Sequence, residues 1–245
     1  MKIPCNLDLP YGASAGERLD IFRPNTEKPA PVQIYVHGGY WISNDKDDCS
    51  YVALGFVNAG FVTVVLNYSL IPTVGMAEQV RQCRAALGWV VENICDYGGD
   101  PTQIYVTGHS AGGHLALMLL TDPQVDSGRI RVLTSLSGLY DLEPVRLSFI
   151  NAKLQLRKRD VADLSPALHR PRDFTTRLLL TVGDEEGEEF RRQMEELAAA
   201  WRPHIRHLST SIVPETNHFS MRAALADSDS AVLRLIRFEM IQSAS

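Results

Sequence analysis

The 245-residue sequence predicts an α/β fold, with a mostly parallel central sheet and helices on both of its faces. Strand-like segments alternate with segments of helical periodicity along almost the whole chain, and this order builds parallel sheets through right-handed crossovers. Several strand-like segments are apolar at every position, as expected for parallel strands that are covered on both faces. No linker or shift in composition divides the chain, so we expect a single domain over residues 1–245.

The strand predictions rest on short runs rich in β-branched residues. We expect the first run to be an antiparallel strand at the edge of the sheet and the others to be parallel. The predicted strands are residues 18–22, 31–36, 61–66, 104–107, 132–136, 177–182 and 210–213.

The helix predictions rest on apolar residues that recur every three or four positions. The segment 76–94 shows one such stripe and ends before the sequence GGDP, which stops helices. The segment 111–120 is apolar nearly all round, which predicts a helix enclosed within the domain. An amphipathic helix is also predicted at 188–201 and a closing helix at 231–241. Residues 141–173 break the alternation and predict a small insertion above the sheet.

The composition argues against several classes of partner. A formal net charge of −5 favours neither nucleic acid nor an anionic membrane. The sequence has no run of eighteen apolar residues and no apolar segment near its start, so we expect a cytoplasmic protein. The four cysteines show neither a C-x-x-C pair nor a metal-like spacing to histidine. We expect no metal and no organic cofactor, and the sequence leaves homodimer formation open.

The sequence GHSAGG at residues 108–113 directly follows a predicted strand and opens a predicted helix. Ligands of parallel sheets bind at the carboxyl edge, where such a turn lies. Gly108 and Gly112 stand two residues either side of Ser110, where side chains would collide as the chain reverses. The N–H groups that begin the helix stabilise negative charge at the same place. This context predicts Ser110 as a nucleophile rather than one serine of an ordinary glycine-rich loop.

A nucleophilic serine needs a base and an orienting acid, which hydrolases with this turn supply in the order serine, acid, histidine. Among the seven histidines, His218 is the one that follows the serine and comes after a predicted strand, residues 210–213, through a short loop. This position again lies at the carboxyl edge of the sheet. We therefore predict that His218 is the general base.

The acid is expected after the predicted strand 177–182, in the sequence GDEEGEE. Glu186 stands where the loop can turn a carboxylate toward His218, and we prefer it. Asp184 is the main rival, although it follows the end of the strand closely. Asp141, which follows an earlier strand, is a third and weaker alternative.

Donors for an oxyanion are expected in the sequence HGGYW at residues 37–41, which follows another predicted strand at the same edge. Glycines let the backbone approach a substrate and aim N–H groups at it. The N–H of Ala111, the residue after the nucleophile, would complete the oxyanion hole.

Together, the sequences HGGYW, GHSAGGHLA, GDEEGEEFRRQ and NHF resemble the α/β-hydrolase superfamily. Within it they resemble the esterase branch of hormone-sensitive lipase-like enzymes and, more closely, the kynurenine formamidases. The sequences NYSLIP, YGGDPTQIYVTGHSAGG, GLYDLEPV and LSP extend this resemblance over most of the chain. The resemblance implies an α/β-hydrolase fold with residues 141–173 as a small cap insertion after the sixth strand. It implies the triad Ser110, Glu186 and His218 and the oxyanion donors Gly39, Tyr40 and Ala111.

The residues and the resemblance predict a serine hydrolase that works through an acyl-enzyme. Its substrate is expected to be a small carboxylic ester or an aryl formamide, with Trp41 as a candidate wall of the substrate pocket. Formamide cleavage like that of kynurenine formamidases and general short-chain carboxylesterase activity are the two main alternatives. Acyl transfer to an acceptor other than water and a non-catalytic small-molecule receptor are weaker ones. Many family members have aspartate as the acid, so Glu186 departs from the commoner pattern.

Overall fold

The computed structural model describes residues 3–172 and 175–243. Within these residues eight strands form one sheet in the order β1-β2-β4-β3-β5-β6-β7-β8. All pairs from β4 across to β8 are parallel, and only β1 and β2 are antiparallel to their neighbours. The strands are β1 Cys5–Pro10, β2 Arg18–Phe22, β3 Ala30–Val36, β4 Val62–Leu66, β5 Gly99–His109, β6 Ile130–Leu136, β7 Arg177–Gly183 and β8 Leu208–Val213.

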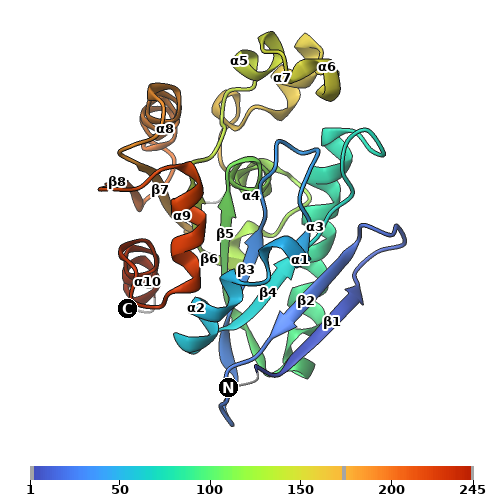
Figure 1. The fold of residues 1–245 in the computed structure, drawn as a ribbon, viewed down its shortest axis with the longest axis vertical. Helices are drawn as coiled ribbons and strands as arrows, with labels where there is room; N and C mark the ends of the chain where they lie inside the picture. The colour runs from blue at the N-terminus through green and yellow to red at the C-terminus, as the bar shows by residue number, and fades with distance from the viewer. Residues whose placement is uncertain (1–2, 173–174, 244–245) are drawn as a thin grey trace.

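Helices cover both faces of this sheet (Figure 1), which confirms the predicted fold class. None of the helices within the described residues is long and apolar enough to cross a bilayer. The helices are α1 Lys46–Cys49, α2 Val52–Asn58, α3 Met76–Asn93, α4 Ala111–Thr121, α5 Glu143–Leu147, α6 Asn151–Leu154, α7 Lys158–Leu164, α8 Glu188–Trp201, α9 His218–Ala223 and α10 Ala231–Ser243.

The two faces of the sheet explain why its strands are apolar at every position. Successive side chains of a strand point to opposite faces. In β4, Val64 packs into the core shared with α3 and α4, whereas Val65 packs into the core shared with α2 and α10. Every residue of β4 is buried as a result.

The antiparallel edge differs from the prediction. Residues 18–22 do form an antiparallel strand, but β1 pairs outside it, so the predicted edge strand β2 is the second strand of the sheet. β1 was not predicted because its sequence, CNLDLP, is mostly exposed and carries little apolar signal. An edge strand with one free side has few side chains to bury.

The central strand β5 is longer than the predicted residues 104–107, since its start pairs with β3 through Ala30 and Gly99. The preceding helix ends as predicted, in a short 3₁₀ turn that Gly98 closes with φ 79°. At its other end β5 runs directly into Ser110 and α4. The longest strand of the sheet therefore delivers the GHSAGG turn to the carboxyl edge.

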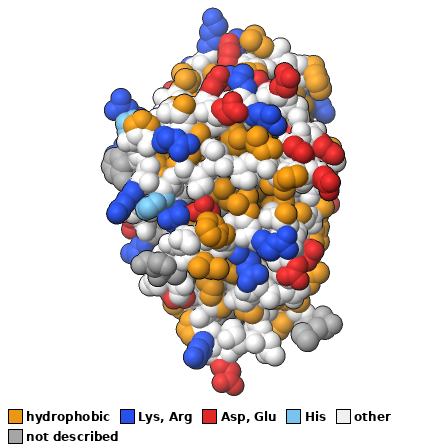
Figure 2. All heavy atoms as spheres, turned by 90° about the vertical axis from the view of Figure 1, so that its left-hand side faces the viewer, with side chains coloured by type: hydrophobic (Ala, Val, Ile, Leu, Met, Phe, Trp, Pro, Cys, Tyr) orange, Lys and Arg blue, Asp and Glu red, His pale blue; other side chains and the backbone are white. Residues whose placement is uncertain are grey.

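The insertion follows β6 as predicted and contains α5, α6 and α7 above the carboxyl ends of the strands (Figure 1, top). Another face of the molecule carries α8, α9 and α10 (Figure 2). On the face that Figure 2 shows, basic and acidic side chains are interspersed with apolar ones.

Candidate active site

Ser110 lies between β5 and α4 in a conformation that side chains rarely adopt, with φ 56° and ψ −122°. Such backbone strain persists only where the surroundings hold it, and it concentrates at active sites. Here the Ser110 N–H donates to the carbonyl of Leu136 at 2.9 Å. A Cβ on Gly108 would collide with the backbone of Gly112, and one on Gly112 with the carbonyls that end β3. The turn therefore requires both glycines, as predicted.

The carboxylate of Glu186 pairs with His218, with 2.7 Å between Oε2 and Nδ1. Its other oxygen accepts hydrogen bonds from the Ser137 hydroxyl at 2.5 Å and from the Gly183 N–H at 2.7 Å. Only 1% of the Glu186 side chain is exposed. Burial alone would raise the pKa of Glu186, but the hydrogen bonds from His218, Ser137 and Gly183 outweigh it and lower the pKa. Glu186 is therefore an anion at neutral pH that can orient an imidazole.

The two rival acids do not contact His218. Asp184 is exposed, and its Oδ1 accepts from the Thr216 N–H at 3.1 Å, which ties the loop after β7 to the loop after β8. Asp141 accepts from the N–H of Glu143 at 2.9 Å and lies beside the base of the insertion. Of the three carboxylates considered, the structure brings only Glu186 to the histidine.

His218 is the first residue of α9, where Asn217 caps the helix by accepting from the N–H groups of Phe219 and Ser220. Because Nδ1 faces an anionic carboxylate, it carries the proton and leaves Nε2 as an acceptor. The rings of His218 and Phe190 stack obliquely at 4.7 Å. The imidazole is thus held in the tautomer that a general base needs.

His109 ties His218 to the turn of Ser110, and the sequence analysis did not identify this contact. Its Nε2 donates to the backbone carbonyl of His218 at 2.8 Å, and the two rings lie 4.6 Å apart. Burial and then the nearby His218 lower the pKa of His109 to about 3, so it stays neutral. Since His109 directly precedes Ser110, this contact holds the loop that carries His218 close to the turn of Ser110.

The loop after β3 carries three successive residues with positive φ, namely Gly39 at 124°, Tyr40 at 50° and Trp41 at 62°. The N–H groups of Ile42 and Ser43 close the turn by donating to the Gly39 carbonyl at 3.1 and 3.0 Å. Among the described residues, nothing accepts the N–H groups of Gly39, Tyr40 or Ala111.

The same loop lies against the turn of Ser110. A Cβ placed on Gly38 would lie 2.9 Å from the Cβ of Ser110 and 2.7 Å from the His109 carbonyl. The backbone can approach the serine this closely only because Gly38 has no side chain. The structure thus brings the predicted oxyanion loop and Ser110 together.

Trp41, predicted as a candidate wall of the substrate pocket, is turned into the protein interior in this structure. Trp41 has no exposed surface, and its indole N–H is used inside the protein, where it donates to Nδ1 of His114 at 3.1 Å. Its neighbours Tyr40 and Ile42 face outward instead: Tyr40 is 46% exposed. Ile42 borders a cavity of about 480 Å³ that Ile71, Pro72 and the α6 residues Ala152 and Lys153 also line.

Ser137 is the second contributor that the sequence analysis missed. It follows β6 with φ 51°, and its N–H donates to the Thr181 carbonyl at 2.8 Å. A serine in the sequence SLSG carries no signal beyond its place at the carboxyl end of a strand. Within the described part of the chain, no group of three or more His, Cys, Asp or Glu side chains is arranged to hold a metal ion.

Comparison with known proteins places this chain in a family. Residues 19–135 match the family model BD-FAE. The kynurenine formamidase of Danio rerio is 32% identical over 238 residues, which cover 94% of this chain and 80% of the relative. Esterase LipQ of Mycobacterium tuberculosis is 38% identical over 149 residues, covering 55% of this chain and 35% of LipQ.

Solved structures share the fold. The crystal structure of esterase B from Lactobacillus rhamnosis, inhibited by a tributyrin phosphonate, superposes with a TM-score of 0.83 at 17% identity. The superposition covers 99% of this chain and 86% of the esterase chain. The chain therefore belongs to the α/β-hydrolase superfamily, in the esterase group that includes the kynurenine formamidases, and is a hydrolase with carboxylesterase- or arylformamidase-like activity.

Proposed function

We propose that this hydrolase cleaves small carboxylic esters or aryl formamides with Ser110 as nucleophile, His218 as base and Glu186 as acid. The observation that carries the proposal is the pairing of the buried Glu186 carboxylate with the partly exposed His218 imidazole. His109, the residue before the strained Ser110, contacts His218 and so brings this pair to the turn. The pair fixes the tautomer of the imidazole, and the turn presents a serine at the carboxyl edge of the sheet. This is the arrangement that acyl transfer requires.

The reaction follows from these positions. Nε2 of His218 takes the Ser110 proton as the serine oxygen attacks the carbonyl carbon, and Glu186 stabilises the imidazolium. The carbonyl oxygen gains negative charge and accepts from the free N–H groups of Gly39, Tyr40 and Ala111. The tetrahedral intermediate then collapses, the leaving group takes the proton from His218, and an acyl- or formyl-enzyme remains. Water that His218 deprotonates releases the acid and restores Ser110.

The substrate class rests on the relatives and on the space near the loop. Relatives are named as a kynurenine formamidase and as esterases, which act on aryl formamides and esters respectively. The cavity of about 480 Å³ beside Ile42 is small and mostly apolar, a size that suits small-molecule ligands. Tyr40 stands next to the expected oxyanion donors and offers an aromatic surface to an aryl leaving group.

The Ser110→Ala variant tests the nucleophile. It should keep its fold and lose hydrolysis by roughly 10⁴-fold or more, because the three residues act as a unit. A fluorophosphonate probe should label the parent at Ser110 and leave the variant unlabelled. Labelling at another serine, or an active alanine variant, would show that the nucleophile lies elsewhere.

A substrate panel tests the specificity. We expect the highest kcat/KM for aryl esters of formic and acetic acid or for N-formyl anilines, and a low value for octanoate esters. Each added methylene changes binding by roughly 1–3 kcal/mol, so the decline should be graded at first and then steep. p-Nitrophenyl esters of increasing length and N-formylkynurenine provide the measurement. Fast acetate cleavage with little turnover of the formamide would select esterase activity, and a preference for octanoate would refute the pocket.

A further inference from the structure

His114 is a fully buried histidine that the proposed reaction does not use. It lies on α4 one turn after Ser110, and its backbone N–H donates to the Ser110 carbonyl at 3.2 Å. Its Nδ1 accepts the indole N–H of Trp41 at 3.1 Å, and its Nε2 lies 2.7 Å from the Leu164 carbonyl. A carbonyl can only accept, so Nε2 carries the proton and Nδ1 is free to accept from the indole.

Burial keeps this imidazole neutral. It lowers the pKa of His114 to about 4, and the hydrogen bond to Leu164 offsets only part of the shift. A neutral ring with one donor and one acceptor fits two partners at once, whereas a protonated ring would repel the indole N–H. At neutral pH the Trp41 indole therefore donates to the His114 ring, and the His114 ring in turn donates to the Leu164 carbonyl.

The three residues belong to three separate parts of the protein. Trp41 ends the run of positive φ angles in the oxyanion loop, His114 lies on the nucleophile helix, and Leu164 is the last residue of α7 in the insertion. The indole and imidazole rings also pack edge to face at 5.2 Å. One side chain thus links the loop, the helix and the insertion.

The oxyanion loop needs such support, because Tyr40 and Trp41 hold left-handed conformations without being glycine. Such strained conformations persist only where the surrounding structure holds them in place. The carbonyl of Trp41 accepts from the Gln79 amide at 2.9 Å and from the Ile71 N–H at 3.0 Å. The same amide donates to the Ser69 carbonyl at 2.9 Å.

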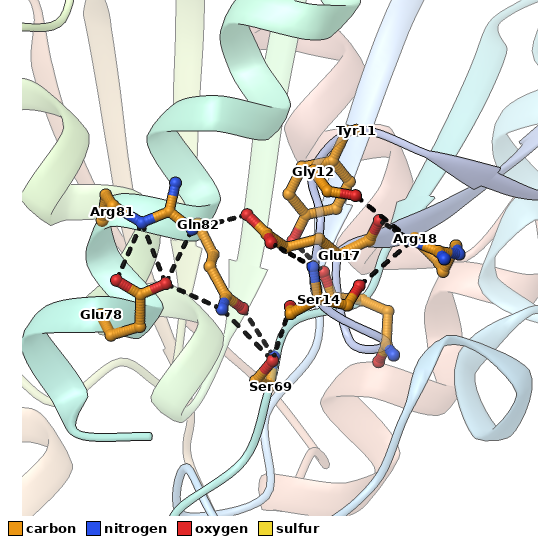
Figure 3. Close-up of polar contacts among 10 residues, drawn as sticks. Tyr11, Gly12, Ser14, Glu17, Arg18, Ser69, Glu78, Arg81 and Gln82 are labelled. Carbon is orange, nitrogen blue, oxygen red and sulfur yellow. Dashed lines mark hydrogen bonds and ion pairs between the residues drawn. The ribbon is translucent and has the colours of Figure 1, made fainter. Parts of the chain in front are cut away.

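Ser69 is itself held by a polar network between the β1–β2 loop and α3 (Figure 3). Its N–H donates to Gln82 at 2.7 Å, and its hydroxyl lies 3.2 Å from that of Ser14. Arg81 then bridges Glu78 and the buried carboxylate of Glu17. The backbone of Trp41 is thus fixed from α3, which leaves its indole to be fixed by His114.

We propose that His114 is a positioning residue for the reaction: through the Trp41 indole it holds the oxyanion loop against the nucleophile helix, and through Leu164 it ties the insertion to both. This rests on the proposed function, in which the N–H groups of Gly39 and Tyr40 stabilise the oxyanion.

Two isosteric variants separate the two contacts. In His114→Asn the side-chain oxygen stands where Nδ1 stood, so it can accept from Trp41 but cannot reach Leu164. In His114→Gln the amide nitrogen stands where Nε2 stood, so it can donate to Leu164 but leaves the indole without its acceptor. Trp41→Phe removes the indole donor directly and serves as the matched variant on the loop.

The readouts are kcat and KM for p-nitrophenyl acetate and the affinity for phenylboronic acid, which forms a tetrahedral adduct with a catalytic serine. We expect His114→Gln and Trp41→Phe to lower kcat by about 10- to 100-fold with little change in KM. Deleting an oxyanion donor lowers kcat by about 10²- to 10³-fold, and a donor N–H that is only displaced should cost less. The affinity for the boronic acid should fall by a similar factor. His114→Asn should keep kcat within about threefold of the parent, and the Gln and Phe changes should not add when combined.

Equal kcat losses in the Asn and Gln variants that follow their melting temperatures would overturn the proposal and leave His114 a packing residue. So would an unchanged affinity for the boronic acid in His114→Gln. Fluorophosphonate labelling of the parent separates the two ideas. A parent that is not labelled at Ser110 refutes the proposed function itself, whereas a labelled parent with either result above refutes only the role of His114.

Discussion

Two histidines near Ser110, His218 and His114, lie in opposite electrostatic environments. On the acid–base side, 23% of the His218 side chain is exposed and the imidazole faces an anionic carboxylate. On the oxyanion side, His114 is fully buried and its partners are an indole and a carbonyl, both neutral. A ring that transfers protons needs access and a partner that stabilises its cation, whereas a ring that fixes a backbone must stay neutral.

His109 resembles His114, because it is buried and neutral, although it contacts His218. It is buried, its pKa is lowered to about 3, and its one hydrogen bond within the described residues goes to the backbone of His218 rather than to the carboxylate. The difference between the two kinds therefore lies in the partner. The imidazole that becomes charged in the proposed reaction, His218, faces the Glu186 carboxylate, whereas the buried and neutral His109 and His114 face backbone carbonyls.

The largest effect should come from the carboxylate itself. Glu186→Gln keeps the shape of the side chain, but an amide can donate to Nδ1 and so favour the wrong tautomer of His218. We expect kcat to fall by roughly 10⁴-fold, as when the acid of a serine triad is replaced by its amide. Steady-state kinetics with p-nitrophenyl acetate gives the measurement.

Asp184→Asn is the matched control for that variant. Asp184 lies in the same loop and accepts from Thr216 rather than from His218. Its replacement should leave kcat within about threefold, because Asp184 is exposed and does not contact His218. A larger loss for Asp184→Asn than for Glu186→Gln would reverse the assignment of the acid.

A smaller loss of kcat is expected when the hydroxyl that binds the Glu186 carboxylate is removed. Ser137→Ala removes the hydroxyl that donates to Glu186 at 2.5 Å, a hydrogen bond to a charged group worth about 1.5–3 kcal/mol. We expect kcat to fall by about tenfold and the pKa of Glu186 to rise. Ser135→Ala is the control, since Ser135 bonds Tyr140 instead and lies two residues away. Equal losses in both variants would mean that Ser137 acts only through packing.

Acid stability gives a further test, at His114 on the oxyanion side. The pKa of His114 is about 4 when folded and about 6.5 when unfolded, so below pH 6.5 the unfolded chain binds a proton that the folded protein refuses. Its contribution to stability is complete above pH 6.5 and declines toward pH 4 by up to about 1.4 kcal/mol per pH unit.

His114→Gln should remove that part of the pH dependence. Urea unfolding at pH 7, 6 and 5 gives the slope for the parent and the variant. His37 and His109 are also buried with lowered pKa values, and they contribute to the pH dependence of both the parent and the variant. Only the difference between the two slopes therefore reports on His114. Parallel slopes would show that His114 is protonated in the folded protein.

The sequence alone was enough to predict the layers of the fold and the strand-to-helix turn of Ser110. Continuous apolar runs mark strands that are buried on both faces, and the glycines of GHSAGG mark a reversal that any side chain would block. It failed for β1, because an exposed edge strand has little apolar content to reveal it. Patterns of burial can be read from a sequence only where burial is strong.

Which carboxylate meets His218, and what holds the loops, was decided only by the tertiary structure. Glu186 and Asp184 stand two residues apart in one acidic loop, and the choice depends on contacts with Thr216 and Ser137, which lie in the loops after other strands. Trp41 was placed in the pocket because its neighbours face a substrate, yet its partner His114 lies 73 positions away and turns the indole inward. Local sequence sets backbone preferences, whereas the direction of a side chain in a loop follows from partners that only folding brings near.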